Sequence, residues 1–548
     1  MNPHAFCKCA GRLLMALAAT TGILLMAACG SGSGSPAPNN NGFSNSSLKG
    51  TYVLSISGTD VNSAGTEAFF AIVGTITADG NGKITGGTVD INDLNLASPG
   101  VFTGETVNAS TYSISSDGRG TGTLATAAGS FGLAFVLTSS NHGLITRFDG
   151  LGSGSGTLDL QGSASQSSLG SLAFSLSGVD YNANDSPLGT VGAVTLNSAT
   201  GSVTAGIQDI VDNFSSTGGL AGLTIATTSS VVLTSGTNGT AQLNTSFGSL
   251  GFDVWVIDAT HLKFIETDTA TSGFALSGDV FTQLTSFTAG QLVFTVGGFD
   301  ISLNPVAAGG FVTTDANGNL TTGIEDYNNA GTANTVPSFT GTCNATAPFA
   351  GDRCQLALTG FTNGSAGNLA FAAYPSSGGI QLLEIDSLGL LQGAAYAQSA
   401  TSFAAAGYGL NLSGLNNNGV STGEVDDIAQ FNATTAVAPA TNMTGVLDEN
   451  DIAQALVSAS LSGAYTPDSP ATGRGSISAT TNGTLIGGLS LEYYVLDPST
   501  ILFIELDSAQ VAVGTFETQS APGSAVAARS RIAVMHPAGR PRGAWRRK

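Results

Sequence analysis

The feature that most constrains this chain is an internal repeat of about 120 residues that occurs four times. Each copy opens with three alternating apolar residues followed by Gly-x-Asp or Gly-x-Asn, and the opening glycines stand 120, 120 and 116 residues apart. Each copy closes with a segment that runs from a glycine to a glutamine, and these glutamines stand 122, 115 and 121 residues apart. The marker residues are Gly58, Gly178, Gly298 and Gly414 for the opening, and Gln161, Gln283, Gln398 and Gln519 for the closing. A period this long exceeds a solenoid rung or a propeller blade and is typical of a small domain.

Within each copy, apolar and polar residues alternate with period two, and turn residues interrupt the pattern. The segment Asp79-Gly80-Asn81-Gly82 has hairpin chemistry, since Gly and Asn accept positive φ. No segment sustains a helical period. The pattern predicts an all-β fold of four tandem antiparallel units with about eight strands each, either up-and-down barrels of lipocalin size or flattened sandwiches. We expect the repeats at 47–161, 162–283, 284–398 and 399–519.

A recurring aspartate indicates that the fourth repeat is shortened. It stands three residues after a glycine in the third expected strand, and successive copies lie 119, 117 and 100 residues apart. The four residues are Asp90, Asp209, Asp326 and Asp426. The short last interval predicts that one hairpin of repeat 4 has lost about twenty residues.

The first 29 residues are typical of an export signal, because two basic residues precede an apolar stretch at 13–26. That stretch is shorter than the ~20 residues that a membrane-spanning helix needs. The sequence MAAC follows at 26–29, and then a Gly-, Ser- and Asn-rich segment at 30–46 that we expect to be a flexible linker. An ordinary signal peptide cleaved after Ala28 is the alternative to attachment of a lipid at the cysteine.

The small residues before Cys29 resemble the lipobox of bacterial lipoproteins, although Met26 stands where leucine is usual. In that family the peptide is cut before the cysteine, which is then acylated, and Gly30 in place of aspartate implies placement in the outer membrane. Together with the repeated opening strand, the turn at 79–82 and the closing segment, the arrangement over residues 1–519 resembles tandem-repeat lipoproteins of environmental Gram-negative bacteria. The resemblance implies a lipid-anchored protein facing the periplasm or the cell surface. It carries no known activity and therefore implies no catalytic residue.

Cysteine usage agrees with export. Cys7 and Cys9 leave with the signal, and Cys29 is assigned to lipid, so that Cys343 and Cys354 remain. A lone, closely spaced pair in an exported protein predicts a disulfide, with two free thiols as the alternative.

The body of the chain is strongly acidic. Residues 30–523 contain 7 Lys and Arg against 37 Asp and Glu, a net charge of −30 that excludes a nucleic-acid-binding surface. We expect these acids to be solvated and to hold divalent cations diffusely. The tail at 520–548 reverses the charge, since its last 25 residues have seven Lys and Arg and no acid. We expect it to be disordered, and it either docks on the acidic repeats or on anionic headgroups, or has no role.

A second series of acids recurs near the end of each repeat. Its members are Asp149, Asp268, Asp386 and Asp507, preceded two residues earlier by Arg147, Glu266, Glu384 and Glu505. Paired carboxylates hydrolyse glycosides when they lie ~5–10 Å apart, and they also bind Ca²⁺. An enzyme needs one site, however, whereas a fold needs its turns in every copy. The recurrence therefore favours a structural role for both series, in which each carboxylate accepts backbone N–H groups at a turn.

The sequence offers few residues for a calcium, zinc or nucleophilic site. Asp315 begins like a calcium loop, but Leu320 stands where an EF-hand requires glycine. The body of the chain has two histidines, His142 and His261, both in expected turns, and no Cys/His cluster has the spacing of a zinc site. We therefore expect no catalytic residue, no cofactor and no specific metal site.

These observations favour a surface-exposed, non-enzymatic outer-membrane lipoprotein whose tandem β modules serve adhesion, matrix contact or envelope structure. Its expected partner is the membrane, through acyl chains on Cys29, and divalent cations, glycans and other surface proteins are further candidates. One alternative is a carrier of small apolar ligands, which predicts an interior cavity of at least ~300 Å³ lined by aromatic residues. A second alternative is a glycan-active enzyme in which one repeat holds opposed, desolvated carboxylates.

Overall fold

The computed structural model describes residues 42–520, apart from 97–99, 184, 213–218, 346–352, 366, 418–422, 436–440, 453, 470 and 483–487. The expected signal, Cys29, residues 30–41 of the linker and all of the basic tail except residue 520 lie outside the described residues. Within the described part of the chain, no helix has the length and hydropathy to cross a membrane.

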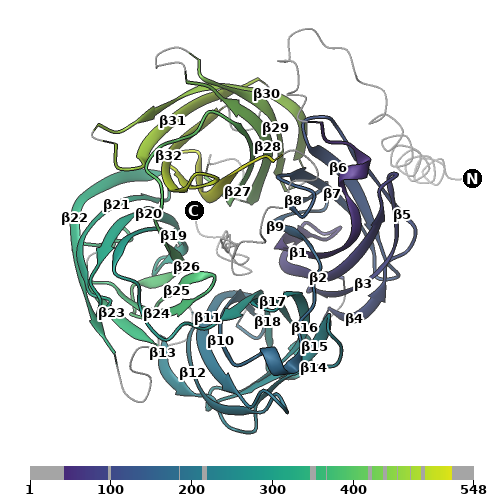
Figure 1. Cartoon of the computed structure of the whole chain (residues 1–548), viewed down its shortest axis with the longest axis vertical. Helices are drawn as coiled ribbons and strands as arrows, with labels where there is room; N and C mark the ends of the chain where they lie inside the picture. The colour runs from purple at the N-terminus through teal and green to yellow at the C-terminus, as the bar shows by residue number, and fades with distance from the viewer. Residues whose placement is uncertain are drawn as a thin grey trace, which may run out of the picture. The chain divides into compact units, whose positions relative to one another are not determined.

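Repeat 1 forms a closed antiparallel barrel with one additional strand (Figure 1). Its strands are β1 (Lys49–Val61), β2 (Glu67–Asp79), β3 (Lys83–Asp93), β4 (Val101–Thr106), β5 (Ser110–Ile114), β6 (Arg119–Ala125), β7 (Ser130–Leu137), β8 (His142–Asp149) and β9 (Gly152–Leu160). They are ordered β2-β1-β9-β8-β7-β6-β5-β3-β4, and pairing of β2 with β3 closes the barrel.

Repeat 2 has the same connectivity in an open sheet, ordered β13-β12-β11-β10-β18-β17-β16-β15-β14. The elements are β10 (Ser171–Asp180), β11 (Ser186–Leu196), β12 (Val203–Asp212), β13 (Leu220–Thr224), β14 (Ser230–Leu233), β15 (Asn238–Asn244), β16 (Ser249–Asp258), β17 (His261–Glu266), the single turn α2 (Thr269–Ser272) and β18 (Phe274–Thr282). An isolated bridge between Ser202 and Ser230 joins the two halves where repeat 1 pairs β3 with β5.

Repeats 3 and 4 are closed eight-stranded barrels. Repeat 3 contains β19 (Gly290–Asp300), β20 (Pro305–Thr314), β21 (Leu320–Asn329), β22 (Thr332–Asn344), β23 (Cys354–Thr359), β24 (Ala370–Ser376), β25 (Gly379–Glu384) and β26 (Gly389–Ala397). Repeat 4 contains β27 (Gly407–Asn416), β28 (Glu424–Ala433), β29 (Met443–Asp451), β30 (Gln454–Pro467), β31 (Arg474–Thr481), β32 (Gly488–Asp497), β33 (Thr500–Glu505) and β34 (Gln510–Thr518). The prediction of four tandem, all-β, antiparallel units of about eight strands is confirmed, and three of them are barrels rather than sandwiches.

The opening and closing segments of a repeat form neighbouring strands of the sheet. Opening strand β1 pairs with closing strand β9, so that Gly58 faces Gly154. A Cβ atom on Gly58 would overlap the backbone carbonyl of Ser153, and one on Gly178 would overlap that of Ala275. The glycine therefore recurs because the two strands that close each barrel approach too closely for a side chain.

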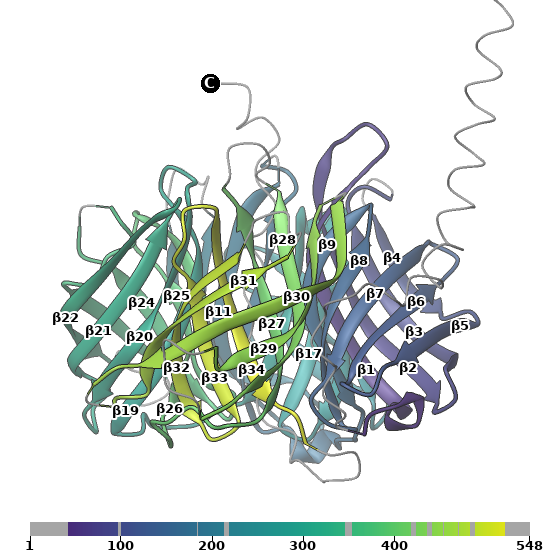
Figure 2. The ribbon, with the colours of Figure 1, turned by 90° about the horizontal axis from the view of Figure 1, so that it is seen from above.

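Apolar clusters lie inside each repeat and also between repeats. Each of the four larger clusters is formed by one repeat alone. Four further clusters join repeat 1 to 2, 2 to 3, 3 to 4 and 4 back to 1, so that the contacts run in a closed cycle. The ribbon shows the repeats in the same cyclic order (Figure 1), and the side view shows their strands next to one another (Figure 2). The pairs that represent these seams are Val53 with Ile257, Val191 with Tyr374, Ala307 with Tyr494, and Val136 with Ile428.

The expected shortening of repeat 4 is wrong. Asp426 lies on the second strand, β28, whereas the third strand, β29, carries Asp448 at 122 residues after Asp326. Repeat 4 thus has a complete set of eight strands. The error arose because both aspartates stand three residues after a glycine, Gly423 and Gly445.

The predicted disulfide is present. Cys343 on β22 and Cys354 at the start of β23 are bonded, with their Cα atoms 5.5 Å apart. These strands are adjacent in the barrel of repeat 3, so the bond joins the two arms of one hairpin.

Candidate functional site

The third strand of every repeat carries a buried aspartate that faces the following repeat. The members of this series are Asp90 on β3, Asp209 on β12, Asp326 on β21 and Asp448 on β29. They are between 0 and 4 % exposed. A buried carboxylate is costly unless charged or hydrogen-bonding groups compensate it, so its partners show what it does.

At the seam between repeats 2 and 3, Asp209 holds two side chains of repeat 3. The guanidinium of Arg353 donates to Asp209 from Nη2 at 2.5 Å and from Nε at 2.8 Å, and the hydroxyl of Tyr374 donates at 2.5 Å. Burial opposes the charge of Arg353, but its hydrogen bonds to Asp209 raise the pKa of the guanidinium above its ordinary value. This desolvated ion pair joins repeat 2 to repeat 3 through two hydrogen bonds, and we call it the Asp209 lock.

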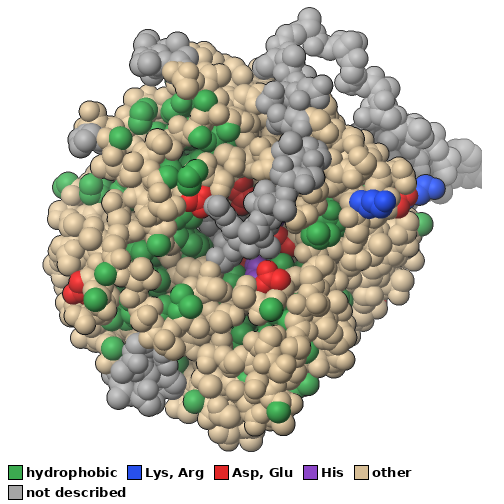
Figure 3. All heavy atoms as spheres, in the orientation of Figure 1, with side chains coloured by type: hydrophobic (Ala, Val, Ile, Leu, Met, Phe, Trp, Pro, Cys, Tyr) green, Lys and Arg blue, Asp and Glu red, His purple; other side chains and the backbone are tan. Residues whose placement is uncertain are grey.

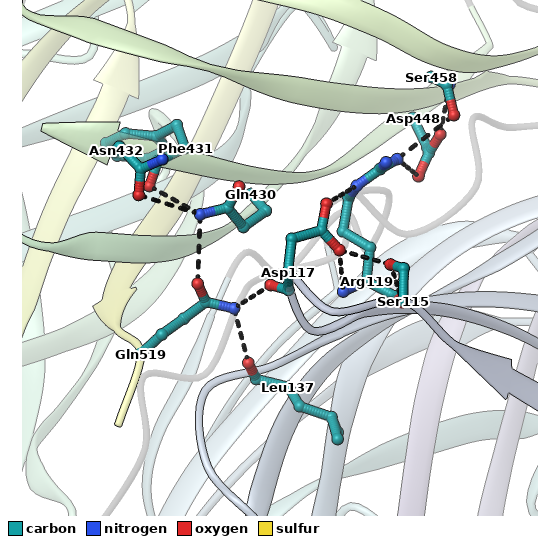
Figure 4. Close-up of polar contacts among 10 residues, drawn as sticks. All are labelled: Ser115, Asp117, Arg119, Leu137, Gln430, Phe431, Asn432, Asp448, Ser458 and Gln519. Atoms are coloured by element: carbon teal, nitrogen blue, oxygen red, sulfur yellow. Dashed lines mark hydrogen bonds and ion pairs between the residues drawn. The ribbon is translucent and has the colours of Figure 1, made fainter. Parts of the chain in front are cut away.

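The other seams use equivalent residues. Arg474 donates to Asp326 at 2.7 and 2.8 Å, and Tyr494 donates to it at 2.7 Å. Asp90 accepts a hydrogen bond at 2.6 Å from Nε1 of Trp255, which replaces the tyrosine. Figure 4 shows the seam that closes the cycle, where Arg119 of repeat 1 reaches Asp448 of repeat 4 at 3.0 Å. The four contacts run from 1 to 2, 2 to 3, 3 to 4 and 4 to 1.

Asp426, which we expected in this series, also lies at the seam between repeats 4 and 1. It accepts hydrogen bonds from the hydroxyls of Ser153 at 2.6 Å and Ser155 at 2.5 Å. It therefore contributes to the closure from a different strand.

The closing glutamines make a second set of seam contacts. Gln519 donates its side-chain amide to the carbonyls of Asp117 at 2.7 Å and Leu137 at 3.0 Å (Figure 4). Gln161 reaches the carbonyls of Thr237 and Val256 in repeat 2, and Gln398 those of Thr472 and Val495 in repeat 4. The last residue of the repeat array thus holds repeat 1 as earlier glutamines hold the following repeats.

The second acid series serves turns. Asp149 accepts the N–H groups of Gly132 and Leu151, Asp386 those of Ala370 and Leu388, and Asp507 those of Ala509 and Gln510, at 2.6–3.0 Å. Asp268 precedes α2 and shares a hydrogen bond with Glu266. These carboxylates fix the turn between the last two strands of each repeat.

The glutamates two residues earlier are sealed inside the barrels. Glu266, Glu384 and Glu505 are each 0 % exposed. Burial, together with the neighbouring aspartate, raises the pKa of each glutamate well above its ordinary value. Desolvation therefore favours the protonated form of each glutamate, in which it can donate a hydrogen bond to that aspartate. A glycan would have to enter the barrel to reach the pair.

In repeat 1, Arg147 occupies the position of these glutamates. Its guanidinium lies 3.2 Å from Asp149 and 3.6 Å from Asp60, and it stacks over Phe70 with its carbon 4.6 Å from the ring centroid. The same position thus holds a cation in one repeat and, in the other three, a glutamate whose pKa is raised by burial.

Both described histidines are buried in ion networks between repeats. His142 has Nδ1 3.1 Å from Asp159 and Nε2 3.0 Å from Glu517 of repeat 4. His261 lies 2.6 Å from Asp279, which also contacts the Lys263 ammonium at 2.6 Å. Burial of Asp279 acts in the opposite direction, but its contacts with Lys263 and His261 lower its pKa to about 2. Since both nitrogens of His142 face carboxylates, this ring is placed to bridge repeats 1 and 4 rather than to activate a nucleophile.

The expected solvated acidic surface is wrong. Of the Asp and Glu side chains, 22 are buried, and none of those described is fully exposed. The space-filling view shows few red or blue side chains among tan ones (Figure 3). Among the described cations, Lys49 and Lys83 are exposed. On the face that this view shows, the described side chains are mainly uncharged, because most of the acids are buried inside the repeats and at the seams.

The calcium-like turn is satisfied by the chain itself. Asp315 accepts N–H groups of Asn317 at 2.8 Å and Asn319 at 2.9 Å, and its other oxygen accepts the Asn319 side-chain amide at 2.9 Å. Across the residues that can be placed, no group of three or more His, Cys, Asp and Glu is arranged to hold a metal ion.

The barrel of repeat 3 contains unfilled space. Repeat 3 holds an apolar cavity of about 50 Å³, well below the ~300 Å³ that the carrier hypothesis required of a barrel interior. A wider groove of about 440 Å³ adjoins it at the barrel mouth.

Comparison with known proteins gives no assignment. No protein-family model matches the chain, and no curated protein matches its sequence.

Proposed function

We propose that this protein is a lipid-anchored outer-membrane protein without enzymatic activity, whose four repeats form one rigid body that serves adhesion, matrix contact or envelope structure. The observation that carries the proposal is the use of the recurring carboxylates. Every aspartate of the third-strand series makes a hydrogen bond across a seam between repeats. Every aspartate of the second series supports a turn or contacts a buried glutamate. Residues that repeat because the architecture needs them are not available for a reaction at a single site.

The neutral polar surface agrees with a presenting or spacing role. Extended hydroxyl and amide surfaces adhere through many weak contacts, whereas strongly charged surfaces steer ions and charged partners. Glycans and other surface proteins are therefore better candidate partners than divalent cations.

The lipid anchor is tested first. The mature protein is expected to begin at Cys29 and to carry acyl chains there, and Cys29→Ser is expected to move the protein from the membrane fraction to the soluble fraction, because acyl chains bind membranes in proportion to the CH₂ groups that they bury. Mass spectrometry of the mature amino terminus gives the answer. An amino terminus at another residue, or an unmodified cysteine, contradicts the proposal.

The role itself is tested by complementation of a deletion strain. Cys29→Ser should fail to restore cell attachment and detergent resistance. Glu384→Gln should restore both, because it keeps a neutral hydrogen-bond donor beside Asp386 while removing a candidate catalytic acid. The opposite pattern, with Glu384→Gln inactive and the unanchored chain active, would support the glycan-active alternative.

A further inference from the structure

The barrel of repeat 3 contains an apolar cavity. Its volume is about 50 Å³, and its lining is apolar except for Thr314. That threonine donates its hydroxyl to the carbonyl of Thr288 at 2.9 Å, so it leaves no free polar group. Five aromatic rings contribute to the wall: Phe287, Phe294, Phe339, Phe361 and Phe371. Cavities of this character exclude water and accept apolar groups.

The mouth of this barrel lacks the cover that other repeats have. In repeats 1 and 2 the segment before the first strand forms a single 3-10 turn, η2 (Asn45–Ser47) and η3 (Gln166–Ser168), followed by a leucine that is 1 % exposed. In repeat 3 the corresponding segment, 284–290, forms no such turn. Its Leu284 is 44 % exposed, and Phe287 is only partly buried.

A residue difference on the first strand of the repeat also leaves the mouth of the repeat 3 barrel less covered. Repeats 1 and 4 place a tyrosine at the mouth, and these rings donate hydrogen bonds to the backbone, Tyr52 to Ser140 at 2.7 Å and Tyr408 to Ala404 at 2.9 Å. Repeat 3 has Leu292 at this position, and it lines the cavity. Repeat 2 also has a leucine here, Leu172, but its mouth has the covering turn. Repeat 3 thus combines the smaller side chain with the uncovered mouth.

A groove continues from the cavity. It has a volume of about 440 Å³ and lies between the segment before β19, the hairpin that joins β24 to β25, and the turn at 496–498 of repeat 4. Leu292, Ile380 and Ala395 line both the cavity and the groove, so the two spaces are adjacent. Unlike the cavity, the groove includes hydroxyl groups, among them Ser286 and Ser377, and one carboxylate, that of Asp497.

We propose that repeat 3 binds a small neutral amphiphile, with the end of a short alkyl chain in the barrel and a hydroxyl-bearing head in the groove. The apolar lining selects the chain, and the hydroxyls that line the groove beside the Asp497 carboxylate select the uncharged, hydroxyl-bearing head. The small interior limits the seated part to a few carbons, since a cavity of ~150 Å³ is what a benzene molecule occupies. This site is independent of the envelope role, which requires no ligand.

Isothermal titration calorimetry of the full-length mature chain carrying Cys29→Ser, so that no detergent is needed, tests the proposal with butyl, hexyl and octyl glucoside below their micellar concentrations. We expect the dissociation constant to fall about fourfold for each added methylene until the cavity is filled, and then to level off. Leu292→Tyr, which copies the residue of repeats 1 and 4, should weaken binding of hexyl glucoside at least tenfold.

Leu172→Tyr in repeat 2 is the matched control, and it should leave the affinity unchanged. Phe287→Ala provides a second readout that does not depend on the folding of Leu292→Tyr, because a wider mouth should extend the chain-length dependence from hexyl to octyl glucoside. Equal affinity for all three glucosides, or equal binding by wild type and by folded Leu292→Tyr, overturns the proposal. An unchanged chain-length limit in Phe287→Ala overturns it as well.

Discussion

Arg353→Met is expected to lower the free energy of unfolding by about 3–5 kcal/mol. The side chain is 4 % exposed, and its partner Asp209 is 0 % exposed, so the substitution leaves a desolvated carboxylate without its cation, with the Tyr374 hydroxyl and the Gly222 N–H group as its remaining donors. An unpaired buried charge costs far more than the net value of the ion pair that it replaces. Urea unfolding followed by circular dichroism measures the loss.

The double variant Arg353→Met/Asp209→Leu separates charge burial from the loss of packing. We expect it to recover most of the lost stability, because apolar replacement of both partners of a buried ion pair is often neutral. Lys83→Met, at an exposed site, should change stability by less than ~0.5 kcal/mol. If the double variant were as unstable as Arg353→Met, Arg353 would stabilise the fold through packing and not by compensating the buried charge of Asp209.

The seam between repeats 4 and 1 gives the array its closed character. It repeats the aspartate contact of the other seams through Arg119 and Asp448, and the glutamine contact through Gln519. Because each repeat is held on two sides, loosening one seam leaves every repeat with a neighbour. The structure thus explains why the spacing of the markers is maintained up to the last glutamine.

The architecture of each repeat was predictable from local sequence. Alternating apolar residues place one face of each strand inward, and Gly-Asn and Asp-Gly turns join strands that follow one another. The opening glycine and the closing glutamine fixed the period, and the structure shows that the glycine lies on the opening strand and that the glutamine directly follows the closing strand that pairs with it. Barrel and sandwich could not be distinguished, because the choice depends on whether the first strands pair with later ones, which alternation does not report.

The seams were missed because their partners are far apart in the sequence. Asp209 and Arg353 are separated by 144 residues, and neither position is unusual within its own strand. A signal was nevertheless present: Arg353 and Arg474 stand 121 residues apart, and Tyr374 and Tyr494 stand 120 apart. Cations that recur with the period of an acid series indicate pairing between copies.

The prediction of a solvated acidic surface failed for a related physical reason. Net charge counts ionised groups, but burial removes the charge from many carboxyls by raising their pKa. Burial raises the pKa of Glu492 to about 7 despite the opposing charge of Arg474, and that of Glu325 to about 9. The formal charge of −30 therefore overstates the charge that the folded protein carries near neutrality.

The same buried acids predict an unusual pH dependence, with greatest stability near pH 4–5 and a steady loss toward pH 9. Burial raises the pKa of Glu325 to about 9 and that of Asp60 to about 8, from ordinary values of 4.5 and 3.8. Below the ordinary values both the folded and the unfolded chain are protonated, so the buried acids carry no penalty. As the pH rises toward the folded pKa, the unfolded chain releases protons first, and each such group costs about 1.4 kcal/mol per pH unit. Below pH 4 the trend reverses. The pKa of Asp279 is lowered to about 2 by its contacts with Lys263 and His261, and the stabilisation from these contacts is lost as the carboxylate becomes protonated.

Glu325→Gln isolates one of these groups and should raise the unfolding midpoint at pH 8 while leaving it unchanged at pH 4. One carboxyl oxygen of Glu325 accepts the N–H group of Thr362 at 3.1 Å, and the other has no hydrogen-bond partner, so a neutral amide of the same shape can keep the first contact. Asp79→Asn is the control with the opposite sign. Asp79 accepts the N–H groups of Asn81 and Lys83, which lower its pKa, so its replacement should reduce stability at pH 8 and have little effect at low pH. Thermal unfolding of the three proteins between pH 4 and 9 decides the matter: if Glu325→Gln and wild type lose stability in parallel, Glu325 is ionised in the folded barrel, and the pH dependence must come from the seams.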